Sequence, residues 1–107
     1  MVYIVTKLWY PPEKAPEVGK IYLETMKKYP VDKSLEKQVV TAAFYATPEG
    51  IHAFAVATIK GSVKDTLQLA NKRLLMMSAG VEGLRYEFNI CLDLGEAMPL
   101  VGLEAPE

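Results

Sequence analysis

The order of the periodic segments constrains the fold of this chain more than any other feature. Six segments follow one another as strand, helix, strand, strand, helix and strand, and together they occupy most of the 107 residues. Two strand–helix–strand units joined through a hairpin form a recurrent arrangement of one sheet and two helices. The order therefore predicts a fold, although it does not name a reaction.

The segment boundaries follow from hydrophobic periodicity and from residues that break helices and strands. β-Branched and aromatic residues fill 2–10, and Pro11 and Pro12 end that strand. The helical segments place apolar residues three and four positions apart. A short turn at 48–50 predicts an antiparallel hairpin. We expect strands over 2–10, 37–47, 51–60 and 84–93, and helices over 15–29 and from 63 to a stop at Gly80.

Strict alternation of apolar and polar side chains over 84–93 indicates which side of the sheet is buried. Right-handed crossovers give a four-stranded antiparallel sheet in the order 4-1-3-2, counting strands along the chain, with both helices on one face. The faces of the second strand stay ambiguous, because both its alternating sets are apolar. To the helix side we assign Leu84, Tyr86, Phe88, Ile90 and Leu92, with Val2, Ile4, Thr6 and Leu8, and with Ala53, Ala55 and Ala57, whose small size should let the helices approach closely.

The opposite side of the sheet has no helix of the same chain to cover it. We call it the open face. It is too aromatic for a hydrated surface and too polar for an ordinary core. Its area is about 500 Å² from strand spacing and rise, near the largest apolar patch of a typical monomer. A second copy packed on it would bury both kinds of residue, so we expect a homodimer or a higher homo-oligomer. The residues are Tyr3, Val5, Lys7, Trp9, His52, Phe54, Val56, Thr58, Lys60, Arg85, Glu87, Asn89 and Cys91.

Composition restricts the partners and the compartment. The formal net charge is −1 and Lys and Arg do not cluster, which argues against nucleic acid or an anionic membrane as a partner. No apolar run reaches the roughly 18 residues of a membrane span. The single cysteine, Cys91, excludes an internal disulfide and suits a reducing compartment. The first residues resemble a strand and not a signal peptide, so we expect a cytoplasmic protein.

Few residues suit catalysis. His52, the single histidine, and Glu87, a possible base in a half-buried site, are the catalytic candidates. Each also has a non-catalytic explanation: His52 as a polar residue at the rim of the sheet, and Glu87 as one partner of a structural salt bridge. We expect no metal site, because one histidine and one cysteine lie far apart in the sequence. We also expect no cofactor, because phosphate-loop and nucleophile motifs are absent.

The candidate ligand-binding residues lie on the open face. The first and fourth strands should be antiparallel neighbours. If Tyr3 lies opposite Cys91, then Lys7 lies opposite Glu87. A charged pair there could orient a polar ligand between aromatic walls. The alternative is a salt bridge and aromatic filling at a subunit interface. The candidates are Lys7, Trp9, Phe54, Arg85, Glu87 and Asn89.

The chain divides into a domain over 1–94 and a C-terminal tail over 95–107. The tail contains Met98, Leu100, Val101 and Leu103, too many apolar residues for a free terminus. We expect the tail to pack on the domain, closing a pocket mouth, or to reach onto a partner subunit.

The layout of residues 2–93 resembles the dimeric α+β barrel superfamily, which includes small antibiotic-biosynthesis-type monooxygenases, stress-responsive barrel proteins and ligand-binding modules. The resemblance implies an α+β, ferredoxin-like βαββαβ sandwich whose sheet packs on that of a second subunit, often with a pocket between sheet and helices. It rests on the element pattern and carries over no catalytic residue.

Three functions follow, and whether the protein is an enzyme stays open. The first is a homodimer that binds a small molecule in a pocket on the open face. The second is a cofactor-independent monooxygenase or isomerase, which needs little beyond a dry cavity and one or two polar groups. The third is a structural or regulatory oligomerisation module without a ligand.

Overall fold

The computed structural model describes residues 1–106, and its main elements follow the predicted order. Each predicted boundary lies within one residue of the observed one. The short 3-10 helix η1 (Pro12–Lys14) precedes the first helix, and α3 (Leu94–Ala97) and the 3-10 helix η2 (Met98–Val101) follow the last strand. The main elements are β1 (Val2–Tyr10), α1 (Ala15–Lys28), β2 (Glu36–Thr47), β3 (Gly50–Ile59), α2 (Val63–Gly80) and β4 (Arg85–Leu92).

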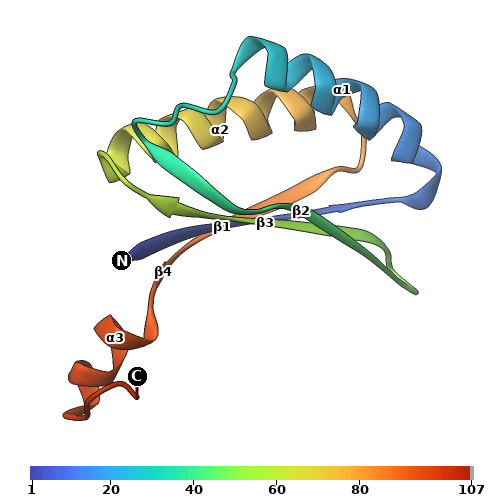
Figure 1. Cartoon of the computed structure of the whole chain (residues 1–107). Helices are drawn as coiled ribbons and strands as arrows, with labels where there is room; N and C mark the ends of the chain where they lie inside the picture. The colour runs from blue at the N-terminus through green and yellow to red at the C-terminus, as the bar shows by residue number, and fades with distance from the viewer. Residues whose placement is uncertain (107) are drawn as a thin grey trace.

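The four strands form one antiparallel sheet in the order β2-β3-β1-β4, which is the predicted order counted from the other edge. Both long helices cover the same face of the sheet (Figure 1). Between β1 and β4, Tyr3 pairs with Cys91 and Lys7 pairs with Glu87, as predicted. The fold is therefore α+β and ferredoxin-like, and the predicted faces of these strands are confirmed.

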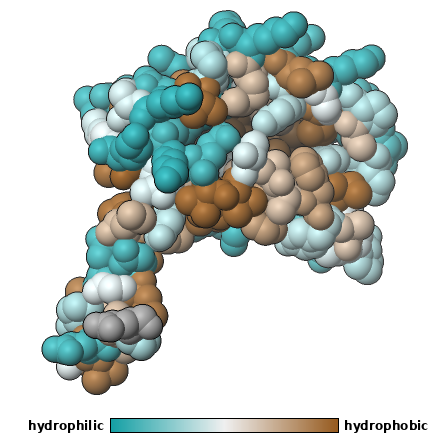
Figure 2. Space-filling model, in the orientation of Figure 1, coloured by the Kyte–Doolittle hydropathy of each residue, from teal (hydrophilic) through white to brown (hydrophobic). Residues whose placement is uncertain are grey.

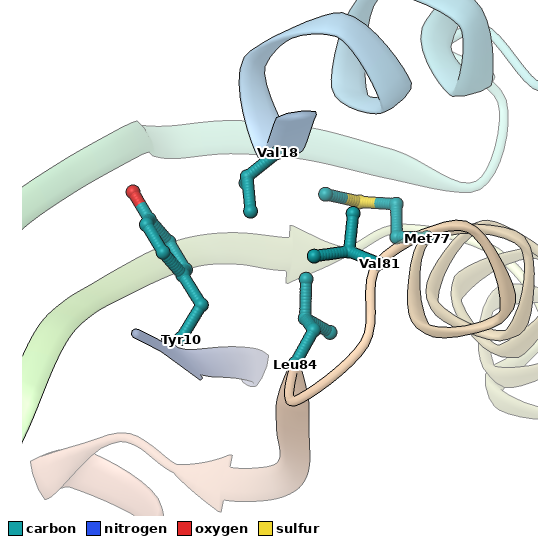
Figure 3. Packing of buried hydrophobic residues seen from close by; sticks show 5 residues of the cluster. All are labelled: Tyr10, Val18, Met77, Val81 and Leu84. Carbon is teal, nitrogen blue, oxygen red and sulfur yellow. The ribbon is translucent and has the colours of Figure 1, made fainter. Parts of the chain in front are cut away.

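Two clusters of buried side chains join the helices to the sheet. The first contains Tyr10, Val18, Met77, Val81 and Leu84, and Figure 3 shows them converging from β1, α1, α2 and the loop before β4. The second contains Ile4, Ala57 and Ala70. Burying one larger apolar side chain contributes about 1.5–3 kcal/mol. The second cluster is built from α2 and the sheet without α1, so α1 is attached to the sheet chiefly through the first.

Strand β2 departs from regular pairing. Its register with β3 shifts between Gln38 and Val40 and again between Val40 and Ala43. Extra residues of this kind bend a strand and change which side chains share a face, which explains why simple alternation left the faces of β2 ambiguous. Beyond the shifts, Phe44 pairs with Ala53 on the helix side, and Tyr45 pairs with His52 on the open face.

After β4 the chain leaves the body of the domain. Figure 1 shows α3 projecting beyond the sheet, on the side away from α1 and α2. A capping box begins α3: Asp93 accepts a hydrogen bond from the Glu96 amide at 2.8 Å, and Glu96 accepts one from the Asp93 amide at 3.4 Å. Leu100 and Val101 are 76% and 71% exposed. Leu100, Val101 and Leu103 are thus largely uncovered in the single chain, and apolar residues are visible on the projection in Figure 2.

Within residues 1–106, no helix combines the length and the apolar character needed to cross a membrane.

Candidate ligand-binding cavity

A cavity of about 370 Å³ lies between the helical layer and the sheet. Its walls come from β1, β2, β3, α1 and α2. Figure 2 shows apolar surface between the helices and the sheet in this region. The cavity is therefore on the helix side of the sheet, opposite the open face.

Small residues leave this space unfilled. Ala53, Ala55 and Ala57 form part of the sheet wall, and Gly19 of α1 faces the same space. Ala57 packs close to Ala70 of α2, as expected for small side chains. The alanines were also expected to let α1 approach the sheet closely, but this is not observed. Beneath α1 the sheet alanines border the cavity, and the space that larger side chains would fill is part of it.

The strand registers orient the cavity. Ala53 pairs with both Phe44 and Leu8, so Phe44 lies near the Tyr10 end of β1. Ile59 pairs with both Glu36 and Val2, which places Glu36 at the opposite end. Among the exposed wall residues, Gly19 belongs to α1, and Ala42 and Phe44 belong to β2. The mouth of the cavity therefore lies between α1 and the edge strand β2.

An ion pair closes the Glu36 end. Arg73 Nη1 lies 3.0 Å from Glu36 Oε1, and both side chains are largely buried. Arg73 also donates from Nε to the Tyr29 carbonyl at 2.9 Å and from Nη2 to the Pro30 carbonyl at 2.8 Å. Each of these bonds involves a charged group and is stronger than a neutral one. Arg73 therefore fixes the loop between α1 and β2 against α2.

Two buried residues of the wall, Thr25 and Tyr10, differ in how accessible their hydroxyl groups are. The Thr25 hydroxyl is completely covered, because the residue is 0% exposed, and it has no hydrogen-bond partner within residues 1–106. Tyr10 is 5% exposed and its hydroxyl also bonds to no described residue. In Figure 3 that hydroxyl points away from Met77, Val81 and Leu84. Burial raises the pKa of Tyr10 above its ordinary value, so its phenol remains a neutral hydrogen-bond donor.

The structure brings the predicted ligand-binding residues together on the open face. The Arg85 guanidinium lies 5.0 Å from the Trp9 ring centroid, a cation–π arrangement. Asn89 donates to Glu87 at 2.7 Å. Lys7 is opposite Glu87 in the register, but no salt bridge joins them in the described part of the chain. Phe54 alone of the six predicted residues also borders the cavity. Their binding of a ligand stays a prediction.

The two catalytic candidates are apart. His52 stacks on Tyr45 with centroids 4.9 Å apart, and its Nε2 lies 2.8 Å from the Thr47 hydroxyl. Glu87 is on β4, and β1 lies between β4 and the strand of His52. Two strand spacings amount to roughly 10 Å, too far for a direct hydrogen bond. Within residues 1–106, no three His, Cys, Asp or Glu side chains are grouped to hold a metal ion.

Sequence reasoning missed four of the polar residues in the cavity wall: Tyr10, Thr25, Glu36 and Arg73. One signal was available. Arg73 immediately precedes Leu74 on the apolar stripe of α2, and a charge beside a buried stripe requires a partner. Glu36 gave no comparable signal, because it stands at the beginning of a strand whose faces were ambiguous.

The fold and the cavity together define a small ferredoxin-like α+β protein with a hollow between helices and sheet. No family model matches this chain, and no curated protein does. The de novo designed protein Foldit4 is 12% identical, with a TM-score of 0.57 over 86% of this chain and 96% of that chain. A Caulobacter crescentus CB15 protein, described as a candidate antibiotic biosynthesis monooxygenase, is 17% identical, with a TM-score of 0.46 over 86% of this chain and 90% of that chain. At 12% identity, the match to Foldit4 indicates a shared fold and not a shared activity.

Proposed function

We propose that this protein binds a small, mostly apolar molecule in the cavity between its helices and its sheet. The observation that carries the proposal is the cavity itself, about 370 Å³ with walls from five elements. Ligand sites occupy about 300–1,000 Å³, whereas well-packed interiors leave few voids larger than a water molecule. The bulged stretch of β2 borders the mouth, and bulges are enriched beside functional sites.

The working unit in this proposal is a homodimer. The open face contains Val5, Trp9 and Val56, which no helix of the same chain covers. The face alone offers about 500 Å², less than the roughly 800 Å² that each partner buries in a standard interface. The projecting tail lies on the same side as this face. Its exposed Leu100 and Val101 would add apolar area to the contact.

A second candidate is a cofactor-independent monooxygenase or isomerase. The mostly apolar wall and the enclosed polar groups in it, which include Tyr10 and the Glu36–Arg73 pair, support this candidate. Such a reaction needs water exclusion and one or two positioned polar groups. The cavity counts against the third candidate, a structural module without a ligand.

The test fills the cavity and measures binding of a neutral apolar probe, N-phenyl-1-naphthylamine, by fluorescence. Ala55→Leu places a larger side chain in the sheet wall of the cavity. We expect this variant to lose probe binding without a large drop in melting temperature, because the added atoms enter empty space. The matched control is Ala46→Leu at an exposed position of β2, which should bind as the unmodified protein does.

Probe binding that is equal in both variants would contradict the proposed site. Mass spectrometry of a bound molecule recovered after incubation in air separates the first two candidates. A binding protein returns the molecule unchanged, an oxygenase adds oxygen mass to it, and an isomerase returns it at the same mass with a changed chromatographic retention.

A further inference from the structure

The cavity wall contains one positive and one negative side chain, and the two neutralise each other. They are Arg73 and Glu36, joined at 3.0 Å. Arg73 makes two further hydrogen bonds, to the carbonyls of Tyr29 and Pro30. A charged ligand would therefore lose its hydration without gaining a free opposite charge, which is strongly unfavourable in an apolar site. The wall thus selects an uncharged ligand.

The remaining polar groups of the wall differ in how enclosed they are. Gln38 and Thr41 lie near the mouth, are exposed, and hydrogen-bond to each other at 3.2 Å. Thr6 and Tyr22 are half-buried, so water can serve their hydroxyls. Tyr10 is the most enclosed of the hydroxyl residues that retain some exposure. A hydrogen bond made in such a place is worth more than one in contact with water.

We propose that the ligand is an uncharged, mostly apolar molecule carrying one hydrogen-bonding oxygen, and that the Tyr10 hydroxyl holds this oxygen. The inference rests on the proposed function, because it assumes that a ligand occupies the cavity. It assigns Tyr10 as the residue that orients the ligand, with the oxygen toward the end of the cavity where Tyr10 and Phe44 lie.

Thr25 provides the matched comparison. Its hydroxyl is also unpartnered and also belongs to the wall, but the residue is 0% exposed. A ligand cannot reach that oxygen without displacing its neighbours. Removal of the Thr25 hydroxyl should therefore leave ligand discrimination unchanged, whereas removal of the Tyr10 hydroxyl should abolish it.

The experiment compares 2-naphthol, 2-methylnaphthalene and 2-naphthoate, which share one ring system and differ in a hydroxyl, a methyl and a carboxylate group. Binding is titrated by fluorescence to the full chain and to Tyr10→Phe, Tyr22→Phe and Thr25→Val, each first checked for an unchanged circular dichroism spectrum. We expect the unmodified protein to prefer naphthol over methylnaphthalene by about three- to tenfold. Naphthoate should bind more weakly than either.

Loss of the naphthol preference in Tyr10→Phe, with the preference kept in Tyr22→Phe and Thr25→Val, supports the inference. It is overturned if Tyr10→Phe keeps the preference, if Tyr22→Phe loses it, or if naphthoate binds best. Equal binding of naphthol and methylnaphthalene to the unmodified protein overturns it too, while leaving the cavity as a binding site. Binding of none of the three probes contradicts the proposed function itself.

Discussion

Glu36 and Arg73 connect the edge strand β2 to helix α2 through a contact of 3.0 Å between Oε1 and Nη1. The two residues are far apart in the sequence, and both are largely buried. Arg73 also holds the carbonyls of Tyr29 and Pro30. One side chain therefore fixes α2, the loop after α1 and the first residue of β2 around one end of the cavity.

Breaking this pair should destabilise the fold strongly. Arg73→Met leaves the Glu36 carboxylate buried without a counter-charge, a change that costs about 3–5 kcal/mol. Urea unfolding measures the loss. Lys72→Met, at the exposed neighbouring position, should change stability by no more than about 0.5 kcal/mol. The double variant Arg73→Met with Glu36→Leu should recover part of the loss, and equal stability of Arg73→Met and Lys72→Met would refute the structural role.

A charge placed on the open face should prevent self-association. Val5 lies between Val56 and Asn89 in the sheet, so Val5→Glu would put an unpaired carboxylate into the proposed interface. Sedimentation velocity at micromolar concentration should show a dimer for the unmodified protein and a monomer for the variant. Leu23→Glu, at a 65% exposed position on α1, is the control and should remain dimeric. A monomeric unmodified protein rules the dimer out.

Removal of the tail tests whether it packs on the domain or on a partner subunit. Deleting residues 96–107 should lower the melting temperature or shift the dimer toward monomer, because the tail's apolar side chains are uncovered in the single chain. Leu100→Asp is the finer test, since an exposed substitution is normally neutral. Light scattering and thermal melts at two protein concentrations measure the effect. Unchanged mass and melting temperature in both variants would mean that the tail contributes neither to stability nor to self-association.

The open-face ligand site is tested by Glu87→Gln. Glu87 is exposed and accepts a hydrogen bond from Asn89, so the variant should melt within a few degrees of the unmodified protein. With the ligand in the cavity, naphthol binding should also stay the same, because Glu87 lies on the other side of the sheet. A variant that stays folded but binds naphthol more weakly would place the ligand on the open face instead.

The Tyr10 phenol makes stability depend on pH at the alkaline end. Burial raises the pKa of Tyr10 above its ordinary value of 10.0. The unfolded chain then ionises first, so the contribution is full below about pH 10 and is lost as the pH rises through the folded pKa. Tyr10→Phe should show a smaller drop in melting temperature between about pH 8 and about pH 11, with Tyr22→Phe as the control. Identical drops in all three proteins would contradict this explanation.

Much of the fold could be predicted from the sequence because its signals are local. The alternation from Leu84 to Asp93 sets the sides of β4, and the short turn before Gly50 sets the β2–β3 hairpin. The β1–β4 register, with Lys7 opposite Glu87, then follows from the lengths of two regular strands. No insertion in either strand disturbs that count.

The resemblance implied a pocket between sheet and helices, but its position and lining could not be derived from the residues, because they depend on distances between elements and not on any one segment. The size of the space beneath α1 depends on which α1 residues reach the core. Val18 is the α1 residue among the five buried members of the first cluster. The register shifts between Gln38 and Ala43 cannot be recognised from the sequence, because both alternating sets of β2 side chains are apolar. The Glu36–Arg73 contact joins β2 to α2. The position of one element along the other is fixed only when the whole chain packs.

The irregular pairing of β2 also affects how copies of this chain can meet. β2 is an edge strand with exposed Val39 and Phe44, and a regular apolar edge invites edge-to-edge pairing with a strand of another copy and fibre growth. Its two shifts interrupt the row of backbone donors and acceptors that an incoming strand would need. Open-ended polymerisation along β2 is thereby disfavoured, and a second copy that binds elsewhere, as proposed for the open face, meets no competing strand-addition edge on β2.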